Sequence, residues 1–252
     1  MRASFKSLST RYKFSNQRYG ARYSVGIDEV GRGALAGPVT VAVACIPDDL
    51  RIENQGWGNL KDSKKLSPAQ RKKWFAYFRN QPALCYSIAR VYPRGVERLN
   101  ISNAANRAAT KACNRLLRKR EIKKFRIFLD GGLYLEDKSE KVRILMRKGA
   151  KNFRKDSRVN SRHFASTIIK GDEKITAIAI ASIIAKVDRD GYMERLSKKH
   201  PRYGFEIHKG YGTKKHFSAI RRYGPSKAHR LTFLLDFLEN RKRKRDDFSR
   251  KS

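Results

Sequence analysis

The sequence predicts an α/β protein, because strand and helix signals alternate along most of the chain. Two β-rich runs, Tyr23 to Asp28 and Val39 to Ile46, flank a turn that contains Gly and Pro, so a pair of strands opens the fold. Later in the chain, the segment that begins at Ala177 is apolar on nearly all sides in its first half. Such a helix belongs deep in a core.

The middle of the chain carries further start signals for helices and strands. Ser67 and Pro68 predict a helix start, because serine caps a first turn and proline fits the first helical position. A strand is expected over Leu84 to Tyr92. Ser102 is expected to cap the next helix, which runs through NAANRAATKACNRLL.

Two later strands are expected to end on acidic residues. FRIFLD reads as a buried strand that ends on Asp130, and STIIKGD as a short strand that ends on Asp172. The long helix that starts at Ala177 follows, and after His200 the chain enters a Gly- and Tyr-rich loop. Two helices are expected beyond that loop, over Lys214 to Arg222 and Leu231 to Asn240.

Length and composition favour one main domain. A chain of 252 residues with 40% hydrophobic composition can build one full-sized core. We expect this domain over residues 23–239, after a flexible basic arm (1–22) and before a charged, disordered tail (240–252). Residues 1–22 contain Arg and Ser but no acidic residue, a composition that an organellar transit peptide shares.

The charge of the chain predicts a polyanionic partner. The net charge is +36, from 59 Lys and Arg against 23 Asp and Glu, and nucleic acid is the first ligand able to neutralise it. A Lys-rich proteome would raise the charge in the same way. No apolar run suits a bilayer span or a secretory signal, so we expect a cytoplasmic protein, or an organellar one if the N-terminus is a targeting segment. The three widely spaced cysteines predict reduced thiols.

Acidic residues close three of the predicted strands. Asp28, Asp130 and Asp172 would converge at one edge of the sheet, because strand ends of an α/β sheet meet there. Clustered carboxylates repel one another and are stabilised by divalent cations, and oxygen ligands favour magnesium or manganese over zinc. Two such ions can serve a phosphoryl displacement. For any single acid, a helix cap or a pair with Arg remains the simpler interpretation.

The turn that follows the first acids has a composition suited to ligand contact. In DEVGRG, Gly31 and Gly33 allow the backbone to approach a ligand closely, and Arg32 adds charge at the same place. A Gly-x-Gly alone is common in ordinary turns. Its position directly after Asp28 and Glu29 makes it informative.

Taken together, these segments and those named next resemble the type 2 ribonucleases H, and most closely the ribonuclease HII family. The resemblance rests on seven segments in the family's order, from Val25 to about Arg230: GIDEVGRGALAGPV, DSKKLS, FLDGG, IIKGD, ASIIAKVDRD, YGFEIHKGYGT and YGPSKAHR. It implies a ribonuclease H-like mixed β-sheet flanked by helices, with a C-terminal helical extension.

The resemblance also implies a function. Members of the family are endonucleases dependent on Mg²⁺ or Mn²⁺ that hydrolyse the RNA strand of RNA–DNA hybrids. They also nick duplex DNA on the 5′ side of embedded ribonucleotides, leaving a 3′-hydroxyl and a 5′-phosphate. Removal of misincorporated ribonucleotides is the expected role. The resemblance favours a monomer, and the C-terminus shows no clear peptide for a sliding clamp.

The resemblance assigns roles to ten residues. The catalytic, metal-binding carboxylates would be Asp28, Glu29, Asp130 and Asp172. The substrate-binding residues would be Gly31, Arg32, Gly33 and Tyr211 near the 2′-hydroxyl and its neighbouring sugar, with Lys64 and Lys65 contacting phosphate.

Other acids and histidines receive structural interpretations. Asp190 is expected to be hydrogen-bonded near the end of its helix, and Asp188 stays outside the site. His208 and His229 are expected to be scaffold groups rather than general bases. Tyr203 and Tyr223, which lie beside glycines, are expected to pack or form turns.

One departure from the family is a basic insert at residues 137–163. It holds ten Lys and Arg against three Asp and Glu, a net charge of +7. A solvated excursion and an arm that grips the duplex backbone both fit, and the mixture of cations with apolar residues favours the arm.

Four alternative functions are weaker. Ribonuclease HIII usually has an N-terminal substrate-binding domain, and a eukaryotic-like catalytic subunit needs partner chains. A non-catalytic nucleic-acid-binding protein would not need all four acids. Another metal-dependent nuclease or integrase would not need both GRG and HKGYGT.

Overall fold

The computed structural model describes residues 22–53, 55–60, 63–119, 125–135, 163–235 and 237–239. The expected N-terminal arm, the C-terminal tail and nearly all of the basic insert at 137–163 lie outside these residues. In the part of the chain that is described, no helix combines the length and apolar character that crossing a membrane requires.

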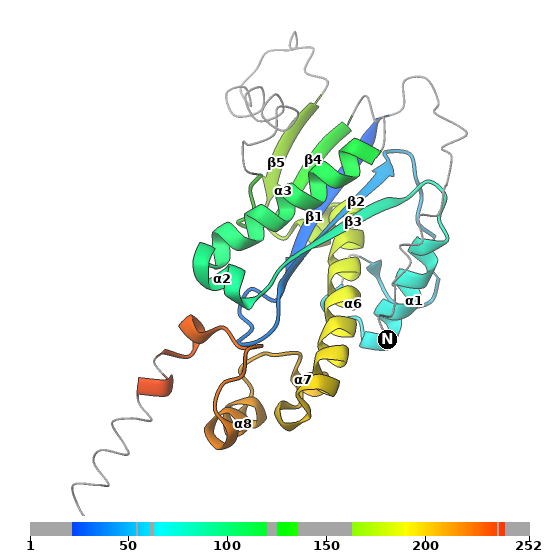
Figure 1. The fold of residues 1–252 in the computed structure, drawn as a ribbon. Coiled ribbons are helices and arrows are strands. Elements are labelled where there is room, and N and C mark those ends of the chain that lie inside the picture. The colour runs from blue at the N-terminus through cyan, green and yellow to red at the C-terminus, as the bar shows by residue number, and fades with distance from the viewer. Residues whose placement is uncertain are drawn as a thin grey trace, which may run out of the picture.

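A five-stranded mixed sheet with the order β3-β2-β1-β4-β5 forms the centre of the molecule (Figure 1). Strands β1, β2 and β3 are antiparallel neighbours, while β4 and β5 run parallel to β1. The strands are β1 (Tyr23–Val30), β2 (Val39–Pro47), β3 (Cys85–Val91), β4 (Phe125–Asp130) and β5 (His163–Ile168). This architecture confirms the predicted α/β class with a mixed sheet.

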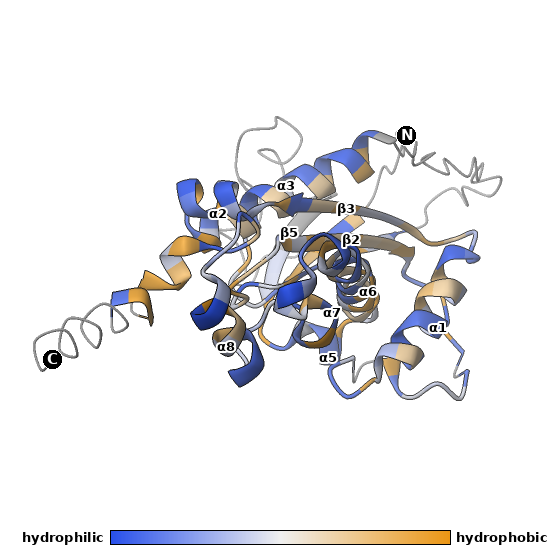
Figure 2. Cartoon of the chain, turned by 60° about the horizontal axis from the view of Figure 1, so that its bottom comes forward, coloured by the Kyte–Doolittle hydropathy of each residue, from blue (hydrophilic) through white to orange (hydrophobic). Residues whose placement is uncertain are grey.

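Helices cover both faces of the sheet. The helices are α1 (Pro68–Arg79), α2 (Pro93–Leu99), α3 (Ile101–Lys119), α5 (Gly171–Lys174), α6 (Thr176–Lys199), α7 (Phe205–His208) and α8 (Lys214–Tyr223), with 3-10 turns at Pro201–Tyr203 and Leu231–Phe233. One apolar cluster joins α3 to the face that carries Val25 and Ile27, and a second joins α6 and α1 to the opposite face. Figure 2 shows hydrophobic colour on β2 and β3 between α3 and α6, and hydrophilic colour on much of α8.

Helix α6 packs unusually close to β1, which explains its apolar character. At Gly26 an added Cβ would lie 2.1 Å from the carbonyl carbon of Ala177, so only glycine permits this contact. The first half of α6 is buried on all sides, from Ala177 to Ala185. The prediction of a deeply buried helix is therefore confirmed.

Several predicted boundaries were wrong, each for a local reason. Strand β1 continues to Val30, since Asp28 and Glu29 remain paired with β2 after the parallel pairing with β4 has ended at Ile27. Ser102 does not cap α3, because Asn100 accepts the backbone N–H of Asn103 at 2.9 Å instead.

The strand before Asp172 also ends earlier than predicted. It stops at Ile168, and Lys170 then takes a left-handed conformation with φ of 54°. Asp172 consequently lies in the first turn of α5 and does not close β5.

The helix start at Ser67 is confirmed by a complete capping box. The Ser67 side chain accepts the Gln70 N–H, and the Gln70 side chain accepts the Ser67 N–H. Three helices were not expected: α2, which begins at Pro93, the short α5, and α7, which lies inside the predicted loop. The helix expected from Leu231 begins as a 3-10 turn.

Candidate active site

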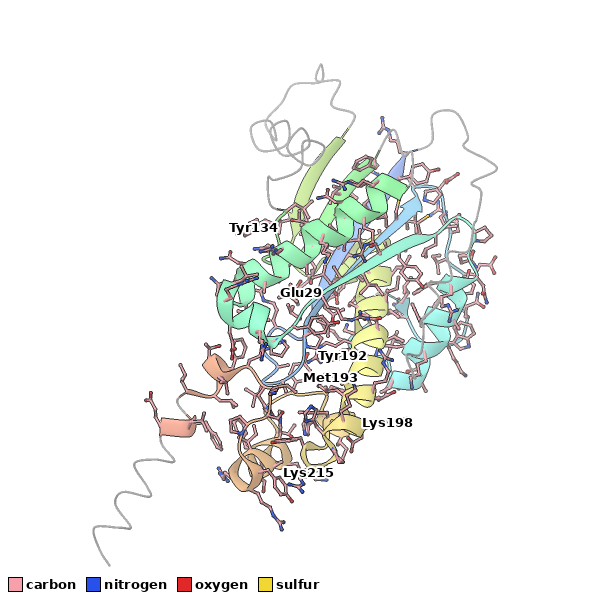
Figure 3. The ribbon with its side chains drawn as sticks, in the orientation of Figure 1. Glu29, Tyr134, Tyr192, Met193, Lys198 and Lys215 are labelled. Atoms are coloured by element: carbon pink, nitrogen blue, oxygen red, sulfur yellow. The ribbon has the colours of Figure 1, made fainter. Side chains whose placement is uncertain are left out.

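The four predicted carboxylates come from three neighbouring elements. Asp28 and Glu29 lie near the end of β1, Asp130 ends the adjacent parallel strand β4, and Asp172 lies in α5. Figure 3 shows Glu29 where β1 approaches the part of the chain that carries α7 and α8. Asp28 and Asp172 are 6% and 1% exposed, so both carboxylates are withdrawn from water.

Asp28 is the most perturbed of these acids. Burial raises its pKa to about 7, with a further rise from the charge of Glu29 and a smaller one from Asp130. Its Oδ1 accepts the Glu29 N–H at 2.7 Å. Ionisation of this carboxyl group is therefore less favourable than that of an ordinary aspartate.

Glu29 is largely buried and pairs with Arg32. Burial raises its pKa, and Arg32 acts in the opposite direction. Arg32 Nη1 donates to Glu29 Oε1 at 3.3 Å, while Glu29 Oε2 is buried and has no hydrogen-bond partner among the described residues. A buried, unpartnered carboxylate oxygen is costly unless a ligand satisfies it.

Asp130 and Asp172 are held by contacts that cross between elements. Asp130 Oδ1 accepts the Gly171 N–H at 2.7 Å, which joins the end of β4 to the start of α5. The Asp172 oxygens lie 3.5 Å from Ser63 Oγ and 3.4 Å from Lys64 Nζ. The DSKKLS segment therefore contacts the carboxylate group directly.

Lys186 is a site residue that the sequence interpretation missed. Its Nζ donates to Ser63 Oγ at 2.9 Å and to Ser182 Oγ at 2.8 Å. Burial lowers the pKa of Lys186, while the charges of Asp28 and Asp172 raise it. The available signal in the sequence was a cation one turn after Ser182, directly at the end of the apolar half of the helix.

The donor set suits hard divalent cations. The atoms available to bind a metal are carboxylate oxygens, which hard divalent cations prefer. The raised pKa of Asp28 and the unpartnered oxygen of Glu29 also favour a bound cation. Within the described ranges, no three acidic, His or Cys side chains stand close enough together to form a finished metal site. The residues therefore fit such ions chemically, while the side chains are not arranged as a complete coordination shell.

Of the predicted substrate-binding residues, Arg32 and Lys64 contact carboxylates of the site directly, Glu29 and Asp172 respectively. Gly31 takes a φ of 87°, Arg32 also donates to Ser102 Oγ at 3.1 Å, and Gly33 is exposed. Lys65 is exposed beside Lys64. The Tyr211 side chain is 39% exposed, and its ring lies 5.3 Å from the guanidinium of the buried Arg189.

The acids assigned to structural roles have basic partners. Asp188 pairs with Arg90, and Asp190 lies 3.6 Å from Arg71. Asp190 is in the interior of α6 and not near its end, because the helix continues to Lys199.

The histidines form a buried scaffold, as expected. His208 Nε2 bonds the Tyr203 carbonyl at 2.7 Å, and His229 Nε2 contacts His216 Nε2 at 3.1 Å. His216 Nδ1 in turn bonds the Tyr211 carbonyl at 2.9 Å. Burial is the main cause that lowers the pKa of His216 and of His229 to about 4, so both are neutral and hold the Tyr211 loop.

Fold and site together define an α/β protein with a carboxylate site at the ends of neighbouring strands, next to a basic, glycine-containing turn. Residues 25–235 match the family model for ribonuclease HII, and the chain belongs to this family. The predicted resemblance is confirmed. Ribonuclease H activity follows: the protein is an endoribonuclease that acts on the RNA of RNA–DNA hybrids.

Curated relatives align over most of both chains. The ribonuclease HII of Chlamydia caviae is 39% identical over 222 residues, which cover 87% of this chain and 89% of that protein. That of Caldicellulosiruptor bescii is 38% identical over 226 residues, covering 90% and 92%. That of Ruminiclostridium cellulolyticum is 38% identical over 220 residues, covering 87% and 73%.

Solved structures share the fold. The ribonuclease H2 of Pyrococcus horikoshii has a TM-score of 0.58 and 28% identity, covering 83% of this chain and 93% of that one. The ribonuclease HII of Archaeoglobus fulgidus, solved in complex with PCNA, has a TM-score of 0.58 and 23% identity, covering 82% and 93%. Bst-RNase HIII, solved with Mn²⁺, has a TM-score of 0.57 and 22% identity, covering 85% and 68%.

Proposed function

We propose that the protein also nicks duplex DNA on the 5′ side of embedded ribonucleotides, leaving a 3′-hydroxyl and a 5′-phosphate, and so removes misincorporated ribonucleotides. One observation carries this proposal: the turn Gly31–Gly33, which follows the strand that holds two of the carboxylates, ends on the exposed Gly33. A 2′-hydroxyl is the group that separates a ribonucleotide from its DNA counterpart, and fixed backbone donors can read it.

Gly33 supplies the donor in this proposal. Its N–H makes no hydrogen bond within the described part of the chain, and nothing lies within 4 Å of the position where a Cβ would stand. A sugar can therefore approach this backbone. Tyr211, half-exposed on the opposite loop, is suited to pack on a neighbouring sugar that lacks a 2′-hydroxyl.

The four carboxylates Asp28, Glu29, Asp130 and Asp172 are the residues that would hold the metal ions. Two Mg²⁺ or Mn²⁺ ions, when bound, supply the activation of water and the charge stabilisation that a phosphodiester displacement needs. Lys64, which lies next to Asp172, and the exposed Lys65 would contact a phosphate of the substrate. Lys186 donates to Ser63 and Ser182 and so holds Ser63 next to Asp172.

The test is cleavage of a DNA duplex that contains one ribonucleotide, with Mg²⁺ or with Mn²⁺. We expect a single metal-dependent nick 5′ to the ribonucleotide. An all-DNA duplex and the Asp130→Asn variant are the controls, and neither should yield a nick. Cleavage of long hybrids without any nick at a single ribonucleotide would contradict the proposal, and so would full activity of Asp130→Asn.

A further inference from the structure

Two arginines are fully buried between the loops that border the site. Arg189 of α6 and Arg230 near the C-terminal 3-10 turn are both 0% exposed. Arg189 donates to the carbonyls of Pro38, Lys209 and Ala36 at 3.0, 2.9 and 3.2 Å. Arg230 donates to the carbonyls of Gly37 and Arg32 at 3.0 and 2.8 Å.

Neither guanidinium forms an ion pair with a carboxylate of the described residues. Burial lowers the pKa of both groups, that of Arg230 to about 10, and the charge of Arg189 contributes to the shift of Arg230. Two like charges buried side by side are unfavourable, and backbone carbonyls only partly replace water around them. Apolar side chains could fill this space but would leave five backbone carbonyls without these donors, so the role of each guanidinium depends on which carbonyls it holds.

One acceptor of Arg230 indicates its role. The Arg32 carbonyl and the Gly33 N–H belong to the same peptide group, and they point in opposite directions. The carbonyl side is buried against Arg230, whereas Gly33 is exposed and its N–H is unpartnered in the described structure. A hydrogen bond from a cation to the carbonyl polarises the peptide group and strengthens its N–H as a donor.

We propose that Arg230 is a positioning residue for ribonucleotide recognition: its guanidinium fixes and polarises the Arg32–Gly33 peptide so that the Gly33 N–H binds the 2′-oxygen of the substrate. This rests on the function proposed above. Arg189 has a different task, because its guanidinium packs under Gly31 and reaches the Tyr211 loop, without touching the Arg32 carbonyl. At Gly31 an added Cβ would lie 2.2 Å from Arg189 Nε.

The polarisation can be measured without substrate. The sequence contains two Arg–Gly peptide bonds, Arg32–Gly33 and Arg94–Gly95. Labelling Arg with ¹³C at the carbonyl and Gly with ¹⁵N therefore restricts a carbonyl–amide correlation spectrum to two peaks. The second peak serves for comparison, because the Gly95 N–H bonds the Tyr92 carbonyl. Glu97 of the same helix accepts the Leu231 N–H, so a shift of both peaks would indicate that the variant displaces α2.

The main variant is Arg230→Gln, whose shorter side chain can still donate near the Gly37 carbonyl but cannot reach that of Arg32. We expect its Arg32–Gly33 peak to move upfield in the carbonyl dimension while the Arg94–Gly95 peak stays in place. Arg230→Lys, which keeps the charge, should return the peak part of the way, and it carries the test if Arg230→Gln does not fold. Arg189→Lys, the matched loss of a buried guanidinium, should move the peak less.

Kinetics then connect the peptide to the substrate. Duplexes with one ribonucleotide and with one 2′-fluoro nucleotide, a much weaker acceptor, are compared under the same conditions. For Arg230→Gln the ratio of their kcat/KM values should fall about tenfold, the effect expected from one charge-assisted hydrogen bond. In Arg189→Lys both values should fall together.

Two results would overturn the inference: a folded Arg230→Gln protein with an unmoved Arg32–Gly33 peak, or a moved peak with an unchanged kcat/KM ratio. Failure of the proposed function looks different. In that case the wild-type protein itself does not nick the single-ribonucleotide duplex, whatever the position of the peak.

Discussion

Asp28 is a carboxyl group whose ionisation opposes folding. Its pKa is raised to about 7 in the folded protein, mainly by burial, whereas an unfolded Asp titrates near 4. A group with a raised folded pKa favours the folded state below its unfolded pKa, and this contribution disappears as pH rises through about 7.

We therefore expect Asp28→Asn to be more stable than the wild type at pH 8 in a chelating buffer. The gain should be a few kcal/mol, and it should shrink as pH falls from about 7 to about 4, where both side chains are neutral. Asn keeps an oxygen for the Glu29 N–H, so this contact is preserved. Denaturant unfolding across this pH range is the measurement, and a variant less stable than the wild type at pH 8 would contradict the argument.

Lys186 provides a second prediction at the scale of single residues. Lys186→Met removes a positive charge next to Asp28 and Asp172, and it removes the donor that Ser63 and Ser182 share, although the two hydroxyls keep their own contact at 3.1 Å. The pKa of Asp28 should rise further, because one of the groups that lower it is lost. The acid limb of the pH profile of kcat/KM on an RNA–DNA hybrid should move to higher pH, and kcat/KM at pH 7 should fall roughly tenfold.

Lys65→Met is the comparison for this variant. It removes a nearby exposed cation and should raise KM without moving the acid limb. An identical shift in both variants would mean that Lys186 acts through overall charge and not through its contact with the serines.

At the scale of elements, the packing of α6 on β1 depends on Gly26. An alanine Cβ there would overlap the backbone at Ala177 and Ile178, and neither backbone can move without displacing the buried helix. Gly26→Ala should destabilise the protein by at least about 1–3 kcal/mol, the usual effect of overpacking a core. Thermal unfolding measures this effect.

Gly132→Ala is the matched control, since nothing lies within 4 Å of its Cβ position and its φ is not positive. Its melting temperature should stay close to that of the wild type. Equal losses in the two variants would mean that the close approach at Gly26 does not limit stability.

Gly26→Ala should also lower activity, because Ser182 and Lys186 lie on α6 and would move with a shifted helix.

At the scale of the whole molecule, the net charge of +36 governs binding to nucleic acid. Affinity for an RNA–DNA hybrid should fall steeply with salt, since each neutralised phosphate releases a counterion. Removal of residues 138–162, which lie outside the described residues and carry much of the positive charge of the insert, should reduce the slope of log affinity against log salt. Hybrid hydrolysis should persist, because the four carboxylates remain.

Fluorescence anisotropy of the Asp130→Asn variant on a labelled hybrid, with and without this deletion, gives the slope without cleavage. An unchanged slope would show that the insert does not contact the phosphate backbone. Abolished hydrolysis in the deleted wild-type sequence would show that the insert supports the site itself.

The sequence alone determined the class of fold, the order of the acids and the family, because these depend on local signals. Alternation of strands and helices, the helix start at Ser67 and Pro68 and the run from Asp28 to Gly33 can all be read from short stretches of the chain. Element boundaries were less accurate: Asn100 outcompeted Ser102 as a cap, and a left-handed Lys170 ended β5 before Asp172.

Only the tertiary structure decided which distant residues support the site. Arg230 reaches the Arg32 carbonyl across 198 positions, and Lys186 reaches Ser63 across 123. These contacts depend on the order of strands in the sheet and on burial, neither of which leaves a periodic pattern in the sequence. The sequence does not distinguish a buried arginine from an exposed one. Arg230 differs from a surface arginine in the backbone carbonyls that the fold brings around it.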